Sequence, residues 1–424
     1  AIRVQDCWAP DINAESDNSF YSTTGTSYGV SISNATMYGR VRGQYLNARH
    51  AVTVGGNTEH GVAWELLVQA TGSAHPDATQ GVFDSHGTSG SVIWDGCTAI
   101  GSAATQRGFG SFARRTVIRN CRVIGAKYGL YLATATHTIE SLEIDGLEMV
   151  NPITGGNAVL LDSVRVNDFK VRNLRGKWGA FGVDILATAT IDRWAPFTDI
   201  YADDGAIFRI LAGATTPAVL TIANCKGEFA SQNDTYAGVF LGDADVTQLT
   251  MQNVETKNVR YFLQTSASAP ATVELLGCRS ITPLRHHVNL GAAATLVKVI
   301  GGEYSNPGTA AQSLITGAGV PVSTTVELMG VKTSGANLTP ILGNTYTTVA
   351  HFGNDFHTTS IFSGTPTELL GGSLNGALVL RGTGTPESAV TAPVGSLFTR
   401  RDGGAGTTLY VKESGSSSTG WVAK

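Results

Sequence analysis

Short stretches in which apolar and polar residues alternate recur along most of the chain. In "TVIRNCRVIGA" (116–126), the central residue is Asn120. The apolar residue Ile118 comes before it, and Cys121 and Val123 come after it. A period of two is typical of a β-strand that buries one face. Asparagine, aspartate and glycine tolerate a left-handed backbone, so we expect the central residue to bend the chain between two strands.

These stretches follow one another at a nearly regular interval of 24–33 residues. Repeats of this length, built from alternating strands, predict coils of a parallel β-helix stacked ~4.8 Å apart. The predicted bends are Asn34, Leu67, Gly96, Asn120, Gly146, Asn173, Asp199, Asn224, Asn253, Gly277, Gly301 and Gly330.

Four of the five cysteines come directly after a predicted bend, namely Cys97, Cys121, Cys225 and Cys278. Most other coils carry valine, leucine or isoleucine at this position, and two carry Ala35 and Gly302. We therefore interpret these cysteines as small buried hydrophobic residues, in preference to metal ligands or redox centres.

A second strand is predicted farther round each coil. In it, Tyr131, Asp184, Arg209 and Asn289 each stand between two apolar residues. Side chains alternate between the faces of a strand, so these four residues are expected to point outward. Asp184 and Arg209 come from consecutive coils and are expected to be neighbours.

Ionisable residues continue along this face in the first coils, with His50, Asp84, His86 and either Arg114 or Arg115. A long exposed sheet of aromatic, acidic and basic side chains suits an extended polysaccharide. The alternative is a ladder of surface ion pairs between coils, which is the simpler interpretation of any single residue. For the face as a whole, we favour a ligand surface.

Composition excludes several other classes of function. The 29 basic and 33 acidic residues give a formal charge of −4, which argues against nucleic acid as a partner. No apolar run approaches the ~18 residues of a membrane helix, so no membrane insertion is expected. No calcium-binding repeat, HExxH motif or P-loop is present, and we expect neither a metal nor a cofactor. Because the chain opens at Ala1, we interpret it as lacking an N-terminal portion.

The pattern predicts an all-β chain in four parts. Residues 1–29 form an N-terminal cap or lead-in, and residues 30–335 form a parallel β-helix of about twelve coils. Residues 336–384 form loose final coils and a linker. Residues 385–424 form a small β module, in which "GSLFTRR", "TTLYVKES" and "TGWVAK" are short strands around glycine-rich turns.

Two regions resemble known proteins. The order Arg49-His50, Asp84-x-His86 with "VIWDGC", "GFGSFARRTVIRNCRVIG" and "YGLYL" resembles the pectate-lyase-like β-helices of bacteriophage tail proteins. Residues 385–424 resemble the C-terminal module of phage tail fibres and tailspikes. The resemblance implies a right-handed β-helix in a homotrimeric tailspike, with the C-terminal module as cap and trimerisation element. It also implies a place on the virion tail, outside the cell at the host surface, attached to other tail components through the missing N-terminal portion.

The same resemblance implies that the chain binds and cleaves a bacterial capsule or O-antigen, and two reactions stay open. A glycosidase needs two carboxylates ~5–9.5 Å apart, which Asp184 could form with Asp162, Asp203 or Asp204. A lyase needs a group that neutralises a uronate and a base for the C5 proton, for which Arg114, Arg209, His50, His86, His137 and Tyr131 are candidates.

We expect Asp184, Arg209, Asp84, His86 and His50 to be catalytic. The expected substrate-binding residues are Tyr131, Arg114, Asp162, Trp194 and Asn289. A non-catalytic receptor-binding fibre of the same fold is the alternative.

Overall fold

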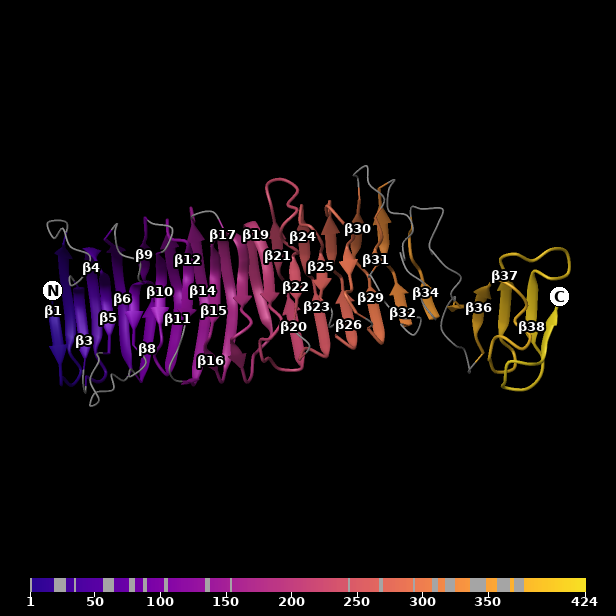
Figure 1. Ribbon diagram of the computed structural model, residues 1–424, viewed down its shortest axis with the longest axis horizontal. Helices are drawn as coiled ribbons and strands as arrows, with labels where there is room; N and C mark the ends of the chain where they lie inside the picture. Colours follow the sequence, from indigo (N-terminus) through magenta and orange to yellow (C-terminus); the bar gives the residue numbers. More distant parts are fainter. Residues whose placement is uncertain are drawn as a thin grey trace. The chain divides into compact units, whose positions relative to one another are not determined.

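The computed structural model describes residues 2–18, 28–33, 36–55, 65–75, 81–86, 90–102, 106–133, 138–152, 155–242, 245–266, 270–292, 294–306, 312–316, 325–335, 348–356, 367–369 and 377–424. All of its regular elements are β-strands (Figure 1). No described segment is a helix that could cross a membrane. The chain divides into an N-terminal unit, Ala1–Val246 with Val254–Arg260, and a C-terminal unit, Thr247–Asn253 with Tyr261–Lys424.

The N-terminal unit is a stack of parallel coils. One coil contains β8 (Ser91–Asp95), β9 (Thr98–Ile100) and β10 (Arg107–Ser111). The next coil repeats this path with β11 (Arg115–Ile124) and β12 (Tyr128–Ala133), each paired in parallel with the strand one coil earlier. The all-β parallel solenoid is thus confirmed, with about eleven turns and a small C-terminal sheet.

Most of the predicted bends are confirmed by their backbone. Ten of them have a positive φ, between 51° at Asn253 and 86° at Gly146. Only Gly, Asn and Asp occupy these ten corners, because an ordinary side chain is strained in this conformation. The ten are Gly96, Asn120, Gly146, Asn173, Asp199, Asn224, Asn253, Gly277, Gly301 and Gly330.

The bends predicted for the first two coils are wrong or untested. Leu67 lies inside β6 (Leu66–Ala74) and pairs with Ile93, three residues before the bend at Gly96. Strand β6 passes this corner without a left-handed residue, whereas β4 (Arg40–Ala48) has Gly43 there, with a φ of 123°. Asn34 lies outside the described residues, but the strand before it, β3 (Tyr28–Ser33), pairs with β5 (His50–Val54) and therefore belongs to the second-strand sheet.

The predicted cysteine stack is buried. Cys97, Cys121, Cys225 and Cys278 are at most 2% exposed. Each thiol donates a hydrogen bond to a backbone carbonyl, as Cys97 does to Val68 at 3.1 Å. Burial raises the pKa of Cys225 to about 12. These residues are core, as the sequence predicted.

Opposite charges form a ladder outside the bends. The Arg122 guanidinium lies 3.1 Å from the Glu148 carboxylate, and Glu148 is in register with Arg175 one coil later. Arg175 in turn lies 5.9 Å from the centre of the Tyr201 ring. Such pairs relieve the repulsion that stacked like charges would cause.

The C-terminal unit also contains parallel strands, among them β26 (Thr272–Leu276), β29 (Leu296–Ile300) and β32 (Thr325–Met329). It also contains a small sheet of β36 (Val379–Gly382), β37 (Leu397–Arg400), β38 (Leu409–Lys412) and β39 (Trp421–Ala423). The last three are the strands predicted for the terminal module. One face of this sheet buries Leu380, Phe398, Tyr410 and Trp421 around Ala392.

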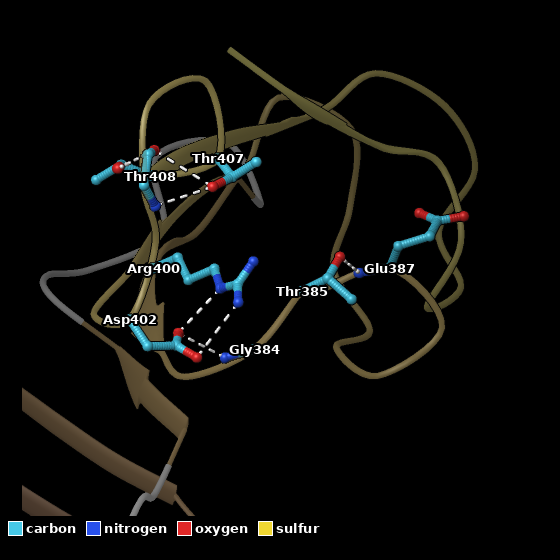
Figure 2. Close-up of polar contacts among 8 residues, drawn as sticks. Gly384, Thr385, Glu387, Arg400, Asp402, Thr407 and Thr408 are labelled. Carbon is cyan, nitrogen blue, oxygen red and sulfur yellow. Dashed lines mark hydrogen bonds and ion pairs between the residues drawn. The ribbon is translucent and has the colours of Figure 1, made fainter.

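Loops of this small sheet are tied by local polar contacts (Figure 2). Asp402 accepts hydrogen bonds from Arg400 at 2.9 Å and from the backbone N–H of Gly384 at 2.8 Å. These contacts lower the pKa of Asp402 to about 2. The domain boundaries predicted at 29, 335 and 384 stay predictions. Strands β1 (Ile2–Gln5) and β2 (Asp11–Asp17) come before residue 29. They already pair in parallel with the corresponding strands of the next coil, β3 and β4.

Candidate active site

Outward positions of the second strand form one file across the N-terminal unit. The strands that carry it are β5, β7 (Gly81–Ser85), β10, β12, β15 (Asn157–Asp162), β17 (Phe169–Ile185) and β19 (Phe197–Ile210). We call this row the outer file, and its members are Thr53, Asp84, Gly110, Tyr131, Leu160, Asp184 and Arg209.

A pocket of about 410 Å³ opens at the N-terminal end of this face. Its lining is rich in cationic and titratable groups. The residues around it are Ile2, Arg3, Tyr28, Ser31, Ser33, Arg49, His50, Thr53, Gly55 and His86. We call it the His50 pocket.

His50 is held as a neutral imidazole in this pocket. It is 3% exposed, its ring stacks on Tyr28 at 5.6 Å, and its Nδ1 lies 2.7 Å from the carbonyl oxygen of Gly81. Nδ1 must carry a proton to donate to that carbonyl, which leaves Nε2 as an acceptor. Burial lowers the pKa of His50, while the nearby Asp84 opposes that shift. The ring is therefore suited to accept a proton.

Asp84 orients His86 at the edge of the pocket. The Asp84 carboxylate lies 3.2 Å from Nε2 of His86, and the carboxylate side chain is 7% exposed while the imidazole is 48% exposed. Thr53 and Gly110 are the neighbours of Asp84 in the adjacent coils. The Asp-x-His motif is therefore one acid and one exposed base held together.

Arg107 also reaches this group, although the sequence did not single it out. Its guanidinium lies 5.3 Å from the centre of the Tyr131 ring and donates to the Tyr131 carbonyl at 3.2 Å. A Cβ at Gly110 would lie 2.9 Å from Oδ1 of Asp84 and 3.1 Å from Nε of Arg107, so both side chains lie over this glycine. Burial lowers the pKa of Arg107, and Asp84 and Tyr131 oppose the shift.

Tyr28, Tyr128 and Asn157 were also missed. They lie three residues before the outer file on their strands, and Tyr128 pairs with Arg107 and Asn157. A polar residue between two apolar ones marks the outer file in the sequence, and this second row has no such pattern. Register with His50 or Arg107 was the signal that could have found it.

Asp184 and Arg209 are neighbours, as predicted, but Asp184 is not exposed. Arg209 donates to both carboxylate oxygens at 2.7 Å, and Asn157 donates to Oδ2 at 3.2 Å. The Arg209 guanidinium also covers the ring of Phe181, 4.5 Å from its centre. Asp184 is fully buried, which raises its pKa against the effect of Arg209 and Asn157. Both of its oxygens are occupied, so it reaches a sugar only if Arg209 moves.

The other carboxylates considered for hydrolysis have contacts with residues other than Asp184. Asp162 accepts from Ser163 and Thr188, each at 3.0 Å. Asp204 is in register with Lys177, five residues before Arg209. Among the described residues, no polar contact joins Asp184 to Asp162, Asp203 or Asp204.

The remaining predicted residues do not join the His50 pocket. Arg114 precedes β11 and is exposed, with its carbonyl accepting from Glu140 and Ser141. Trp194 precedes β19 and donates to the Val219 carbonyl at 2.6 Å. Asn289 belongs to the C-terminal unit, and His137 lies outside the described residues. Within the described ranges, no three His, Cys, Asp or Glu side chains gather as metal ligands would.

A comparison of the sequence with protein families adds an independent finding. Residues 1–148 match the family described as Gp49, pectin lyase-like. This range includes the whole His50 pocket, Asp84, Arg107 and Tyr131, and it ends before Asp184. No curated protein and no solved structure matches the chain. The match suggests a phage protein that binds or degrades polysaccharide. The match and the parallel solenoid fit a phage pectate-lyase-like β-helix protein, and this confirms the resemblance read from the β-helix sequence.

Proposed function

We propose that this chain binds and cleaves an acidic polysaccharide of the bacterial surface, a capsule or an O-antigen, with the His50 pocket as the reaction centre. The observation that carries the proposal is a neutral, oriented His50 in a pocket that also presents Arg3, Arg49 and His86. A buried base beside cationic groups suits the removal of a proton next to a carboxylate. The family match over the same residues supports this assignment.

The reaction we propose is β-elimination at a uronic acid. Arg3 and Arg49 neutralise the uronate, and Nε2 of His50 takes the proton at C5. The electron pair forms the C4–C5 double bond while the C4–O4 bond breaks. His86, oriented by Asp84, gives a proton to the leaving O4. Cationic stabilisation of the carboxylate and a positioned base are what such an elimination requires.

Two alternatives rest on other observations. Hydrolysis by Asp184 requires Arg209 to leave both carboxylate oxygens. A non-catalytic receptor-binding fibre is favoured by the extent to which charges along the face already satisfy one another, as in the Asp184–Arg209 pair. In either proposal the chain works as a homotrimer on the phage tail, outside the cell, attached to other tail components.

The test is incubation with polygalacturonate, alginate, hyaluronan and purified capsular and O-antigen polysaccharides. New reducing ends together with an ultraviolet-absorbing unsaturated product would support the elimination. New reducing ends without that absorbance would replace it with hydrolysis, and binding without new ends would support the fibre. Arg49→Ala should lose activity on the acidic polymer. Arg115→Ala is the matched control, because the Arg115 side chain is 62% exposed and pairs with Glu140, which does not line the pocket.

A further inference from the structure

A second hollow, of about 470 Å³, lies where β17 and β19 turn from the first strand of the coil to the second. The residues that line it are Asn151, Pro152, Lys177, Gly179, Asp204, Phe229 and Asn233. The pairing of β17 with β19 shifts register on both sides of Lys177, and the pairing of β19 with β21 (Lys226–Glu228) shifts between Ala202 and Gly205. Bulges of this kind re-aim side chains and are frequent next to functional sites.

Two opposite charges at this hollow do not pair. Lys177 and Asp204 are register partners on adjacent strands. Several other register partners of opposite charge on the N-terminal unit bind each other, as Arg122 and Glu148 do at 3.1 Å. Neither Lys177 nor Asp204 forms an ion pair or side-chain hydrogen bond with any residue that the structure describes. An ammonium and a carboxylate therefore both remain ready for an outside partner.

The far wall of the hollow is fixed by packing. It is formed by the connection between β21 and β22 (Val239–Leu241), which projects from the edge of the coils (Figure 1). Phe229 stacks on Tyr236 with ring centres 5.9 Å apart, and Tyr236 meets the edge of Phe181 at 5.2 Å.

Asn233 is held in the same wall. Its Oδ1 accepts from the backbone N–H groups of Thr235 and Tyr236 at 2.8 and 3.0 Å, and its own N–H donates to Asn258 at 2.8 Å. The amide keeps its NH₂ donors for another group. The hollow thus combines an acceptor, a cation and an amide on a rigid frame.

We propose that this hollow is a second polysaccharide-binding site, which holds one hydroxyl-rich sugar unit of the same chain that the His50 pocket takes. Asp204 accepts from sugar hydroxyls, and Lys177 and Asn233 donate to ring or hydroxyl oxygens. The assignment rests on the proposed function for the identity of the polymer.

The distance between the two sites sets the length of chain required. Five steps of strand pairing lead from β5, which carries His50, through β7, β10, β12 and β15 to β17, which carries Lys177, or ~24 Å at ~4.8 Å per coil. The Phe181 ring, which packs against the wall of the hollow, also lies under Arg209, so the hollow adjoins the outer file at that end. A bound chain of several sugar units spans both sites, whereas a disaccharide reaches only one.

The experiment measures binding of the polymer from the test panel that the protein binds most tightly, and of its disaccharide. It is done by titration calorimetry in a His50→Asn background, so that cleavage does not interfere. Lys177→Met and Asp204→Asn should each weaken polymer binding about tenfold and leave disaccharide binding unchanged. Lys170→Met, on the same strand, and Asp234→Asn, in the same connection, are the matched controls. Both residues are exposed and paired elsewhere, with Asp168 and Arg260.

Each outcome separates the second site from the proposed cleavage. Unchanged polymer affinity in both variants would overturn the second site, even if the wild type cleaves the polymer. Weakened polymer affinity without any cleavage by the wild type would support the second site and overturn the elimination. Equal losses for polymer and disaccharide would overturn the spacing argument, and with it the proposal. Failure of the wild type to bind any polymer of the panel would overturn both.

Discussion

Asp84 and Asp184 occupy the same position of the same outer file, yet the structure treats them differently. Asp84 binds a histidine that is 48% exposed, whereas the partner of Asp184 is an arginine that is 27% exposed and seals both carboxylate oxygens. The neighbouring coil explains the difference. Next to Asp84 stands Gly110, over which the side chains of Asp84 and Arg107 lie, and next to Asp184 stands Arg209, which covers both carboxylate oxygens. The same strand position therefore holds a carboxylate beside an exposed histidine in one coil and a closed ion pair in another.

Removing the proposed base from the His50 pocket should have the largest effect on cleavage. His50→Asn keeps a side-chain N–H for the Gly81 carbonyl but removes the acceptor at Nε2. Cleavage should fall ~10²–10⁴-fold, the usual contribution of a general base. The rate is measured from unsaturated product formed per minute. Retention of full activity with unchanged melting would remove His50 from the mechanism.

Breaking the Asp184–Arg209 ion pair should instead affect the stability of the fold. Asp184→Leu leaves the Arg209 charge without its buried partner and should lower the free energy of unfolding by ~3–5 kcal/mol. The double variant Asp184→Leu/Arg209→Leu should recover much of this loss. Urea denaturation measures both. Loss of cleavage in Asp184→Asn with unchanged unfolding would instead place this carboxylate in the chemistry.

The loss of stability in acid has to be separated from the loss of activity that titration of the His50 pocket should cause. His287, in the C-terminal unit, is fully buried, and burial lowers its pKa to about 3. The unfolded chain takes up a proton near pH 6.5 and the folded chain does not. This stability is therefore complete above pH 6.5 and is lost as the pH falls, by ~2 kcal/mol at pH 5.

His287→Gln should remove most of that dependence. The urea midpoint is compared at pH 7 and pH 5 in both proteins. If the variant loses as much stability as the wild type, His287 is not the group that titrates. In the His287→Gln variant, the acid decline of activity reports the pocket without this unfolding, and it should begin below pH 6.5 because the pKa of His50 is lowered.

Filling the space beside Asp84 should have the smallest effect. Gly110→Ala places a methyl group against both Asp84 and Arg107 and should reduce cleavage about tenfold, equivalent to ~1.4 kcal/mol. Gly404→Ala is the control, because a Cβ there meets nothing within 4 Å. An unchanged kcat/KM in Gly110→Ala would show that the space does not matter.

The sequence predicted the repeated part of this molecule because the repeat has a local cause. A bend with positive φ needs Gly, Asn or Asp, so Asn120 and Gly146 are visible in the sequence. Strand β6 passes its corner without such a residue, and the bend was therefore misplaced at Leu67. Coil spacing also sufficed to bring Asp184 next to Arg209. It could not show that Asp184 is buried, because that depends on Asn157 and Arg209 from the coils on either side. Arg107 could not be predicted either, because its position near Asp84 depends on the missing side chain at Gly110.

The cysteine stack has a consequence for where the protein can work. A thiol is reactive as its thiolate, and burial holds Cys97 and Cys225 in the protonated form. Their role is to fill volume, which is the same in a reducing and in an oxidising compartment. The interior would thus be the same in both kinds of compartment, because within the described residues it has no disulfide to form or to lose.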